Sequence, residues 1–189
     1  MRRFLLVSLL LLFSLPVNAA DSGAIYSVPQ AGPATVCFTS GNHSALGGDC
    51  VALVVSEIGK AQRTLLVQAY NFSEPNIIAA IIAARRRGVA VTVILDKTSP
   101  RQRGEGADDV ALAGIPVFVD TRPKIAHNKV MVIDGATVIT GSFNFTSSAQ
   151  CCNAENLLVL RSPELASAYA ANFMRRQAVS VAYRPAGAG

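Results

Sequence analysis

The chain has 189 residues, of which 51% are hydrophobic, and its formal net charge is +5. This length fits one domain, and removal of Arg2 and Arg3 with a leader would leave 5 − 2 = +3. A mildly basic balance suits a polyanionic substrate without proving one. The sequence has no Lys/Arg-rich tail, which excludes binding through an electrostatic nucleic-acid arm.

Residues 1–20 predict a secretory signal peptide. Arg2 and Arg3 form its basic end, the apolar run 4–15 is too short to span a bilayer, and small residues follow Pro16. An uncleaved membrane anchor is the alternative. We expect a periplasmic or secreted protein without stable membrane insertion after cleavage. A loose lead-in over 21–35 precedes a domain over 36–180, and a flexible C-terminal tail follows over 181–189.

Apolar periodicity and turn residues predict strands that alternate with helices. Ser73 is the expected N-cap of one helix, with Pro75 in its first turn, and Pro163 opens the last helix. Their order, with a hairpin after the alternating part, predicts an α/β fold: a mixed, mainly β-sheet with helices on both faces. The predicted strands are 36–38, 64–70, 89–95, 115–119, 129–133, 137–140 and 157–160, and further helices are expected at 51–59 and 105–113.

Four cysteines in an exported protein indicate disulfide bonds. Cys37 and Cys50 bracket a polar, Gly-rich stretch that a bridge would close, and we expect this pair. Cys151 and Cys152 are adjacent, so they pair with each other only through a strained ring. Free thiols or a bridge between subunits are the alternatives. The cysteine spacing matches no common zinc site.

A histidine and a lysine open the run that carries most of the functional information. His127 and Lys129 are two residues apart, so on a strand both side chains project to the same face. A histidine serves as nucleophile or proton carrier near neutral pH, and a lysine is a positive charge suited to a phosphate oxygen. The other histidine, His43, is expected in an exposed loop, and no pair of histidines has the spacing of a metal site.

The rest of this run predicts a hairpin. Asp134-Gly135 indicates a tight turn. The return strand then brings Gly141, Ser142 and Asn144 back to the end of the sheet where the run began. A nucleophile, a cation and polar donors would therefore surround one small volume.

These residues resemble the HxKxxxxD signature of the phospholipase D superfamily, followed by its GSxN element at 141–144 and by NAEN at 153–156. The resemblance runs from about residue 34 to the end of the last helix and is closest to small secreted bacterial endonucleases with one motif copy. It implies a phospholipase D-like catalytic domain and no cofactor. Larger members build one site from two copies, so a single copy implies a homodimer with its site across the two-fold axis.

The resemblance also implies roles. One copy of His127 is the nucleophile and its mate is the general acid. Lys129 and Asn144 bind the non-bridging oxygens of the phosphate. Glu155 accepts a hydrogen bond from His127 and fixes its tautomer, with an ordinary surface carboxylate as the alternative. Ser142 is either a further donor to the substrate or a turn residue.

Other residues near the motif have structural interpretations. Asp134 lies more than about 10 Å along the strand from Lys129, so we expect it, with Gly141, to be structural. Phe143 and Phe145 are expected to bury their loop against the sheet, with stacking on a base as the alternative. Residues 85–87, all arginine, suit the end of a helix, with phosphate steering as the alternative.

The sequence therefore predicts an enzyme, a metal-independent phosphodiesterase of nuclease type that acts on DNA, with RNA as a further substrate. A neutral imidazole avoids the repulsion between an anionic nucleophile and a phosphodiester. The first rival is a phospholipase that acts on phospholipid headgroups, for which no amphipathic surface helix or large apolar loop is evident. The second is a non-catalytic nucleic-acid-binding module, which the intact pair of His127 and Lys129 argues against.

Overall fold

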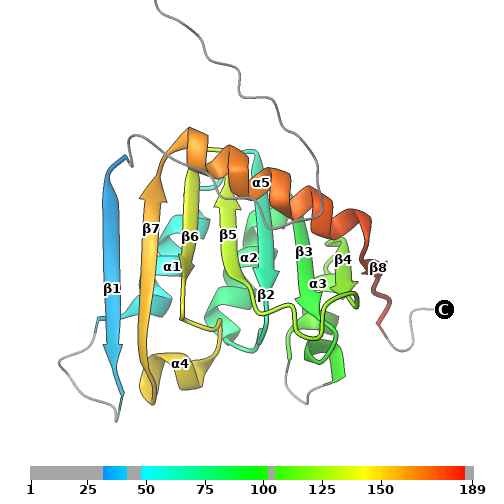
Figure 1. Cartoon of the computed structure of the whole chain (residues 1–189), viewed down its shortest axis with the longest axis horizontal. Helices are drawn as coiled ribbons and strands as arrows, with labels where there is room; N and C mark the ends of the chain where they lie inside the picture. Colours follow the sequence, from blue (N-terminus) through cyan, green and yellow to red (C-terminus); the bar gives the residue numbers. More distant parts are fainter. Residues whose placement is uncertain (1–31, 42–47, 102–104, 186–189) are drawn as a thin grey trace, which may run out of the picture.

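The computed structural model describes residues 32–41, 48–101 and 105–185, and the strands within them form one eight-stranded sheet with helices on both faces (Figure 1). The strand order is β1-β7-β6-β5-β2-β3-β4-β8. The β2–β3 and β3–β4 pairs are parallel, and the other neighbours are antiparallel. The predicted α/β fold is confirmed. The expected signal peptide and His43 lie outside the described residues.

The strands follow the apolar runs of the sequence. Their bounds are β1 Ala34–Ser40, β2 Thr64–Ala69, β3 Ala90–Asp96, β4 Val117–Asp120, β5 Lys129–Ile133, β6 Thr137–Gly141, β7 Ala154–Arg161 and β8 Val181–Ala182. β5 is buried along its whole length, as expected for a central strand covered on both faces.

The C-terminal segment corrects one prediction. Val181–Ala182 form β8 on the edge of the sheet beside β4, so the tail predicted from residue 181 is partly ordered. The backbone N–H of Tyr183 donates to the carbonyl of Val117, and its hydroxyl donates to Asp108 at 2.7 Å. The bond to Asp108 raises the pKa of Tyr183 to about 12. A two-residue strand shows no periodicity, which is why the sequence does not predict it.

Five helices pack on the sheet or at its edge in the described residues. They are α1 Cys50–Gly59, α2 Pro75–Arg86, α3 Ala107–Leu112, α4 Ser147–Cys151 and α5 Pro163–Ala178, with a 3₁₀ turn η1 at Ser99–Arg101. The larger core lies between the sheet and α1, α2 and α3. A smaller one, centred on Val130, Val132 and Val138, lies under α5. None of the helices in the described part of the chain is long and apolar enough to cross a membrane.

The start of α2 differs from its prediction by one residue. Glu74, not Ser73, is the N-cap, and its carboxylate accepts from the backbone and side-chain amides of Asn76. Pro75 occupies the first helical position, so the residue before it takes the cap. The backbone N–H groups of Ser73 and Glu74 both donate to the carbonyl of Phe145, which fixes α2 to the loop after β6.

The topology brings many chain segments to one edge of the sheet. β2, β3 and β4 end at this edge, the lower one in Figure 1. β5 is antiparallel to β2 and therefore begins there. β6 ends there and β7 begins there, since each is antiparallel to its neighbour. The residues at these strand ends form the candidate active site, and we call this the site edge.

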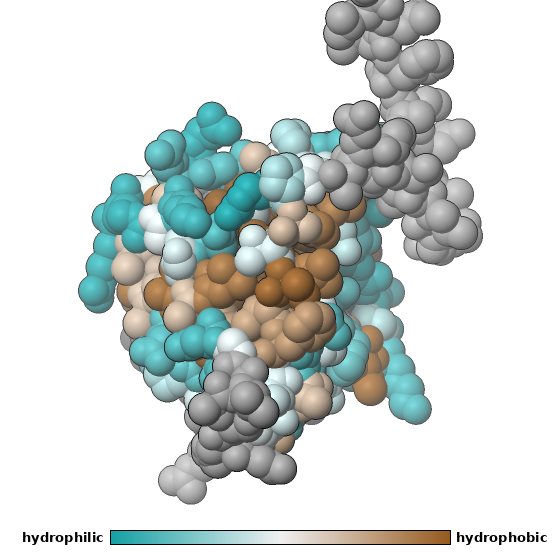
Figure 2. Space-filling view, turned by 90° about the vertical axis from the view of Figure 1, so that its left-hand side faces the viewer, coloured by the Kyte–Doolittle hydropathy of each residue, from teal (hydrophilic) through white to brown (hydrophobic). Residues whose placement is uncertain are grey.

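β1 is one of the two edge strands of the sheet, at the side away from β8. Val36 and Phe38 on its outward face are 51% and 61% exposed, and Figure 2 shows apolar surface on this side of the molecule. Cys37 on the other face is bonded to Cys50 at the start of α1, with an S–S distance of 2.01 Å. The pair that the sequence favours therefore ties the edge strand to a helix.

Candidate active site

His127 and Lys129 meet around one aromatic ring at the site edge. The His127 and Tyr70 ring centroids are 4.5 Å apart, with the planes inclined by 55°. The Lys129 Nζ lies 5.1 Å from the Tyr70 ring centroid and donates to the backbone carbonyl of His127 at 3.1 Å. His127 is exposed, whereas Lys129 is only 6% exposed. The imidazole thus faces solvent beside a cation held in a fixed position.

Sequence reasoning missed Tyr70 and its neighbour Asn71. Ala69 pairs with Lys129 in the register of β2 and β5, so the two residues after Ala69 reach the level of His127. An aromatic and a carboxamide directly after a buried strand were the available signal. That signal needs the β2–β5 pairing to be useful, and the sequence does not give strand order.

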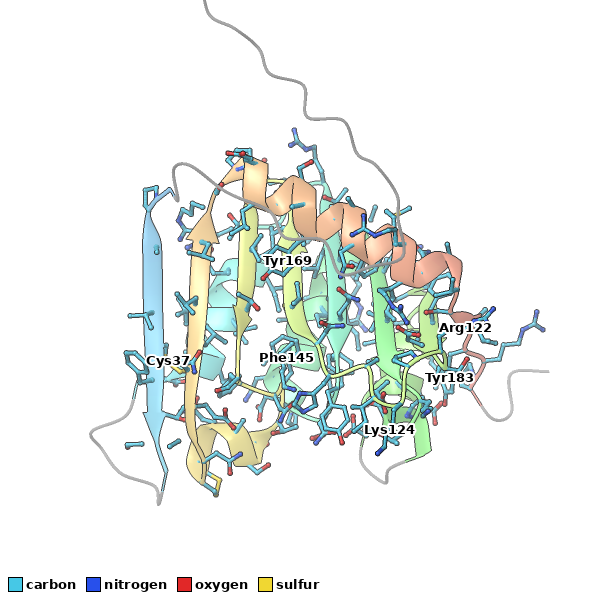
Figure 3. All side chains as sticks on the ribbon, in the orientation of Figure 1. Cys37, Arg122, Lys124, Phe145, Tyr169 and Tyr183 are labelled. Carbon is cyan, nitrogen blue, oxygen red and sulfur yellow. A yellow bond between two sulfur atoms is a disulfide. The ribbon has the colours of Figure 1, made fainter. Side chains whose placement is uncertain are left out.

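Asn144 and Asn71 both hold unused polar atoms. Their side-chain oxygens are buried and accept no hydrogen bond from the described residues. Buried polar groups in folded proteins nearly always have partners, so these acceptor oxygens at the site edge suit a ligand group or water that donates a hydrogen bond. Phe143 and Phe145, each 1% exposed, bury the loop that carries Asn144 against the sheet, where Figure 3 labels Phe145.

Glu155 is held differently from the prediction. Its carboxylate accepts from the hydroxyl of Ser142 and from the side chain of Asn153 at 3.0 Å. No hydrogen bond joins His127 to Glu155 in the described residues, so the predicted tautomer-fixing bond does not form within one chain. Both carboxylate oxygens already have donors. Glu155 therefore serves as the common acceptor that holds the side chains of Ser142 and Asn153 in place.

Ser142 is part of the same network. Its hydroxyl proton goes to Glu155, and its oxygen accepts from the backbone N–H of Asn156 at 3.0 Å and from the Asn156 side chain at 3.3 Å. A hydroxyl has one proton to donate. In this arrangement Ser142 has none left for a phosphate, so the geometry favours its turn-forming role.

Burial sets the electrostatics of the lysine. It lowers the pKa of Lys129, while the negative charge of Glu155 raises it, and burial has the larger effect. A phosphate placed beside Lys129 would supply a second negative charge in a partly dehydrated setting, where attraction between charges is strong. The site therefore suits an anionic ligand.

Asp134 and Gly141 have backbone roles at opposite ends of the β5–β6 hairpin: Asp134 lies in its turn, and Gly141 ends β6 at the site edge. Asp134 has φ 53° and Gly135 has φ 65°, the positive values that a hairpin turn of this type requires. Gly141 has φ 146°, and a Cβ there would lie 2.3 Å from the carbonyl oxygen of Asn156. Only glycine fits at this close approach, which delivers the following residues to the site edge.

The Asp134 carboxylate has its own structural task. It accepts backbone N–H groups from Gln62, Arg63 and Thr64 at 2.8–2.9 Å. Burial alone would raise its pKa, but these three bonds and the charge of Arg63 outweigh burial and hold the pKa of Asp134 below its ordinary value. Asp134 thereby fastens the start of β2 to the β5–β6 turn.

The adjacent cysteines are bonded to each other. Cys151 and Cys152 close an S–S bond at the end of α4, the five-residue helix that the sequence analysis did not predict. Asn153 follows directly and donates to Glu155. This bridge, rather than the free thiols or the intersubunit bond considered as alternatives, therefore borders the network around Glu155.

Taken by its parts, the site edge offers an exposed imidazole, a buried ammonium and two carboxamides, all from strand ends and one loop. An imidazole supplies a nucleophile or a proton, and the ammonium stabilises negative charge. The described residues hold no cluster of three or more His, Cys, Asp and Glu side chains placed to bind a metal ion.

Comparison with known proteins gives concordant findings. The family model described as "Cardiolipin synthase, PLD-like domain" matches residues 54–177. The phospholipase D of Rickettsia conorii is 41% identical over 144 residues, which cover 76% of this chain and 69% of that protein. The mitochondrial cardiolipin hydrolase of Xenopus laevis is 35% identical over 123 residues, or 65% of this chain and 58% of that protein.

A solved structure is also similar. Nuc from Salmonella typhimurium, a phospholipase D family member, is 34% identical to this chain. The two superpose with a TM-score of 0.73, and the match covers 81% of this chain and 99% of that chain. The similarity therefore extends over nearly the whole of that chain.

Proposed function

This chain belongs to the phospholipase D superfamily, and we propose that it is a nuclease, a phosphodiesterase that cleaves DNA, with RNA as a further substrate, without a metal ion. The observation that carries the proposal is the arrangement around Tyr70, which holds the His127 ring and the Lys129 ammonium together. The carboxamide oxygens of Asn71 and Asn144 lie buried at the same edge and accept no hydrogen bond from the residues that the structure describes.

The reaction proceeds in two displacements at phosphorus. An imidazole nitrogen of His127 forms a bond to phosphorus while the bond to the leaving oxygen breaks, and that oxygen takes a proton from the partner subunit's His127. The same partner histidine then removes a proton from water. The water oxygen attacks phosphorus, the P–N bond breaks, and a phosphomonoester leaves.

Lys129 stabilises both transition states. Its ammonium is held by the carbonyl of His127 and the face of Tyr70, so little reorganisation is needed when charge grows on the non-bridging oxygens. The side-chain oxygen of Asn144 accepts no hydrogen bond from the described residues. The NH2 group of the same carboxamide is the donor to the non-bridging oxygens. In this proposal Lys129 and Asn144 therefore act in substrate binding and catalysis, as the resemblance to the family implies.

The two-histidine mechanism needs a homodimer. His127 is the single histidine among the described residues, and one imidazole cannot be nucleophile and leaving-group acid at once. A second copy supplies the acid through two-fold symmetry. Sedimentation of the active protein should give a dimer, and full activity in a monomer would overturn this part of the proposal.

A phospholipase is the second candidate function. Ile125, two residues before His127, is 47% exposed, and an apolar side chain beside the nucleophile suits the surface of a lipid bilayer. The relatives named phospholipase D and cardiolipin hydrolase agree with a lipid substrate. The site chemistry would be the same for either substrate, so only an assay of both separates them.

We also place the protein in the periplasm or outside the cell. The support is the predicted signal peptide together with the Cys37–Cys50 bond, since disulfides persist in oxidising compartments. N-terminal sequencing of the mature protein from a periplasmic fraction should show that the mature chain begins after residue 19 or 20. Intact Met1 on a membrane-bound protein would contradict this placement.

One assay panel tests the function. The purified protein is given double-stranded DNA, single-stranded DNA, RNA and labelled phospholipid vesicles, each with and without EDTA, and His127→Ala is the matched control. The proposal predicts nucleic-acid cleavage that survives EDTA and disappears in His127→Ala. Cleavage of vesicles alone would favour the phospholipase, and loss of all activity in EDTA would contradict the mechanism.

A further inference from the structure

The loop between β4 and β5 spans residues 121–128, and its first part, 121–126, carries two cations that the proposed mechanism does not use. Arg122 and Lys124 are exposed, and neither side chain has an ion-pair or hydrogen-bond partner among the described residues. Figure 3 shows Lys124 at the site edge of the sheet and Arg122 farther along, near Tyr183. The loop leads directly into His127.

The backbone of this loop is fixed by hydrogen bonds to two residues at the end of β3. The buried carboxylate of Asp96 accepts the backbone N–H of Ala126 at 2.6 Å, and the Lys97 ammonium donates to the carbonyl of Pro123 at 3.0 Å. Burial would raise the pKa of Asp96, but hydrogen bonds from Thr98 and Ala126 more than offset it and keep the carboxyl ionised. The loop is therefore fixed at its middle and at its end.

The carboxylate that directly precedes the loop, that of Asp120, is paired with an arginine. Asp120 is 1% exposed, and Arg176 donates to both of its oxygens at 2.7 Å. The same carboxylate accepts the backbone N–H of Arg122 at 3.3 Å. The carboxylates of Asp96 and Asp120 thus bond to backbone groups and to Arg176. Within residues 32–41, 48–101 and 105–185, this leaves the side chains of Arg122 and Lys124 without a counter-charge.

Two unneutralised cations on a fixed backbone next to a phosphodiesterase nucleophile suit phosphates other than the one being cleaved. His127 is three positions after Lys124, so their Cα atoms are at most about 11 Å apart. Backbone phosphates follow one another at about 3.4 Å of rise in one strand. Lys124 therefore lies within reach of phosphates a few nucleotides from the scissile bond. Arg122 is two residues farther from His127 along the loop, so it suits phosphates farther along the same strand.

We propose that Arg122 and Lys124 form a second anion site that holds the backbone phosphates of a polynucleotide on one side of the scissile bond. The inference rests on the proposed nuclease function. It adds that this loop makes the enzyme prefer a polynucleotide to a small phosphodiester. A small diester occupies only the catalytic site and gains nothing from this loop. A polynucleotide spans both, so its rate depends on the loop and on salt.

The experiment compares two variants with the same loss of charge. Arg122→Gln/Lys124→Gln removes the loop cations, and Arg85→Gln/Arg86→Gln removes two cations from the end of α2, at the opposite edge of the sheet. For each protein kcat/KM is measured on a 30-nucleotide single strand, on bis(p-nitrophenyl) phosphate and on anionic phospholipid vesicles, over a range of salt concentrations. The main readout is the ratio of the oligonucleotide to the small-diester value.

The loop variant should lower this ratio about 10-fold or more at low salt, and the α2 variant should leave it unchanged. Two lost phosphate contacts on a single strand should reduce the slope of log(kcat/KM) against log salt by about 1.4. Equal ratios in the loop and α2 variants would overturn the inference, as would a loss confined to vesicles, which would assign the loop to a lipid surface. If the unsubstituted protein cleaves the small diester but no nucleic acid, the proposed function fails, and the inference fails with it.

Discussion

One HxKxxxxD signature runs along β5, from His127 at one end to Asp134 at the other. The polar groups at these two ends differ in how many of their hydrogen bonds are made. At the turn end, the Asp134 carboxylate accepts three backbone N–H groups. At the site end, beside His127 and Lys129, the side-chain oxygens of Asn71 and Asn144 are buried and have no hydrogen-bond partner in the part of the chain that the structure describes. One strand thus joins a fully bonded corner to one with unused hydrogen-bonding capacity.

The difference separates structural from functional residues within one motif. Satisfied buried groups stabilise the fold, whereas unsatisfied ones weaken it and persist where a ligand completes them. By this criterion Asp134, whose carboxylate has three donors, belongs to the fold. The corner with the unpartnered carboxamide oxygens, which also holds His127 and Lys129, belongs to the chemistry. Substitutions at the two ends should therefore change different measured quantities.

The largest effect is expected at the site end from His127→Ala. Removal of the nucleophile should lower kcat on DNA at least about 10⁴-fold, as loss of a covalent catalyst does in other hydrolases. Because His127 is exposed, the free energy of unfolding should change by less than about 0.5 kcal/mol. Rate assays measure kcat, and urea unfolding of the same preparation measures the free energy of unfolding. A variant that stays active would show that His127 is not the nucleophile.

Lys129→Met should have the next largest effect, a loss of about 10²- to 10³-fold in kcat, because a charge that stabilises the transition state disappears. Burial lowers the pKa of Lys129, so the ammonium loses its proton as pH rises through a value below that of an ordinary lysine. The unsubstituted protein should therefore lose rate on the alkaline side before about pH 10.4. Lys129→Arg, which stays charged, should lack this decline in whatever activity it retains, and the same decline in both proteins would exclude Lys129 as its cause.

At the turn end, Asp134→Asn should act on stability instead of rate. An amide oxygen cannot replace a carboxylate that accepts three N–H groups, so the free energy of unfolding should fall by about 2–4 kcal/mol. The kcat of the folded variant should stay within about two-fold of the unsubstituted value. A large fall in kcat at full stability would move Asp134 into the chemistry.

The pH dependence of stability provides a control for that substitution. Hydrogen bonds hold the pKa of Asp134 below its ordinary value in the folded protein, so its stabilising contribution is present above the unfolded pKa and is lost as pH falls through the folded pKa. The gap in unfolding free energy between the unsubstituted protein and Asp134→Asn should therefore narrow below about pH 4. A gap of constant size from pH 7 to pH 3 would contradict the carboxylate account.

The smallest effect is expected from the adjacent disulfide at the site edge. Cys151→Ser/Cys152→Ser opens a ring of two neighbouring residues and should cost about 1 kcal/mol or less, because such a ring constrains the unfolded chain little. Cys37→Ser/Cys50→Ser opens a loop with a sequence separation of 13 and should cost about 3 kcal/mol. Thermal unfolding of the two variants compares them, and a larger loss from the adjacent pair would reverse their ranking.

The parts of the structure that the sequence predicts are those with strong local signals. The apolar run of β5 gives its bounds without error, and Asp134-Gly135 gives the hairpin. α4 and β8 were missed because they are too short to show a period. The cap of α2 was displaced by one residue because the position of Pro75 outweighs the preference for serine.

The site was predicted only as far as the motif extends. The sequence identifies His127, Lys129 and Asn144, but it does not tell which strand lies beside β5, so Tyr70 could not be found. It also assigns Glu155 to His127, whereas the folded chain gives that carboxylate to Ser142 and Asn153. Hydrogen-bond partners depend on side-chain placement across strands, which spacing along one strand does not determine.

The covalent intermediate tests the central claim most directly. Rapid acid-free quenching of the protein with a ³²P-labelled oligonucleotide should leave label on the protein that is stable to base and lost in acid, the behaviour of a phosphohistidine. The account predicts this label in the unsubstituted protein and in Asp134→Asn, and none in His127→Ala. Label that persists in His127→Ala, or that is lost from folded Asp134→Asn, would contradict it.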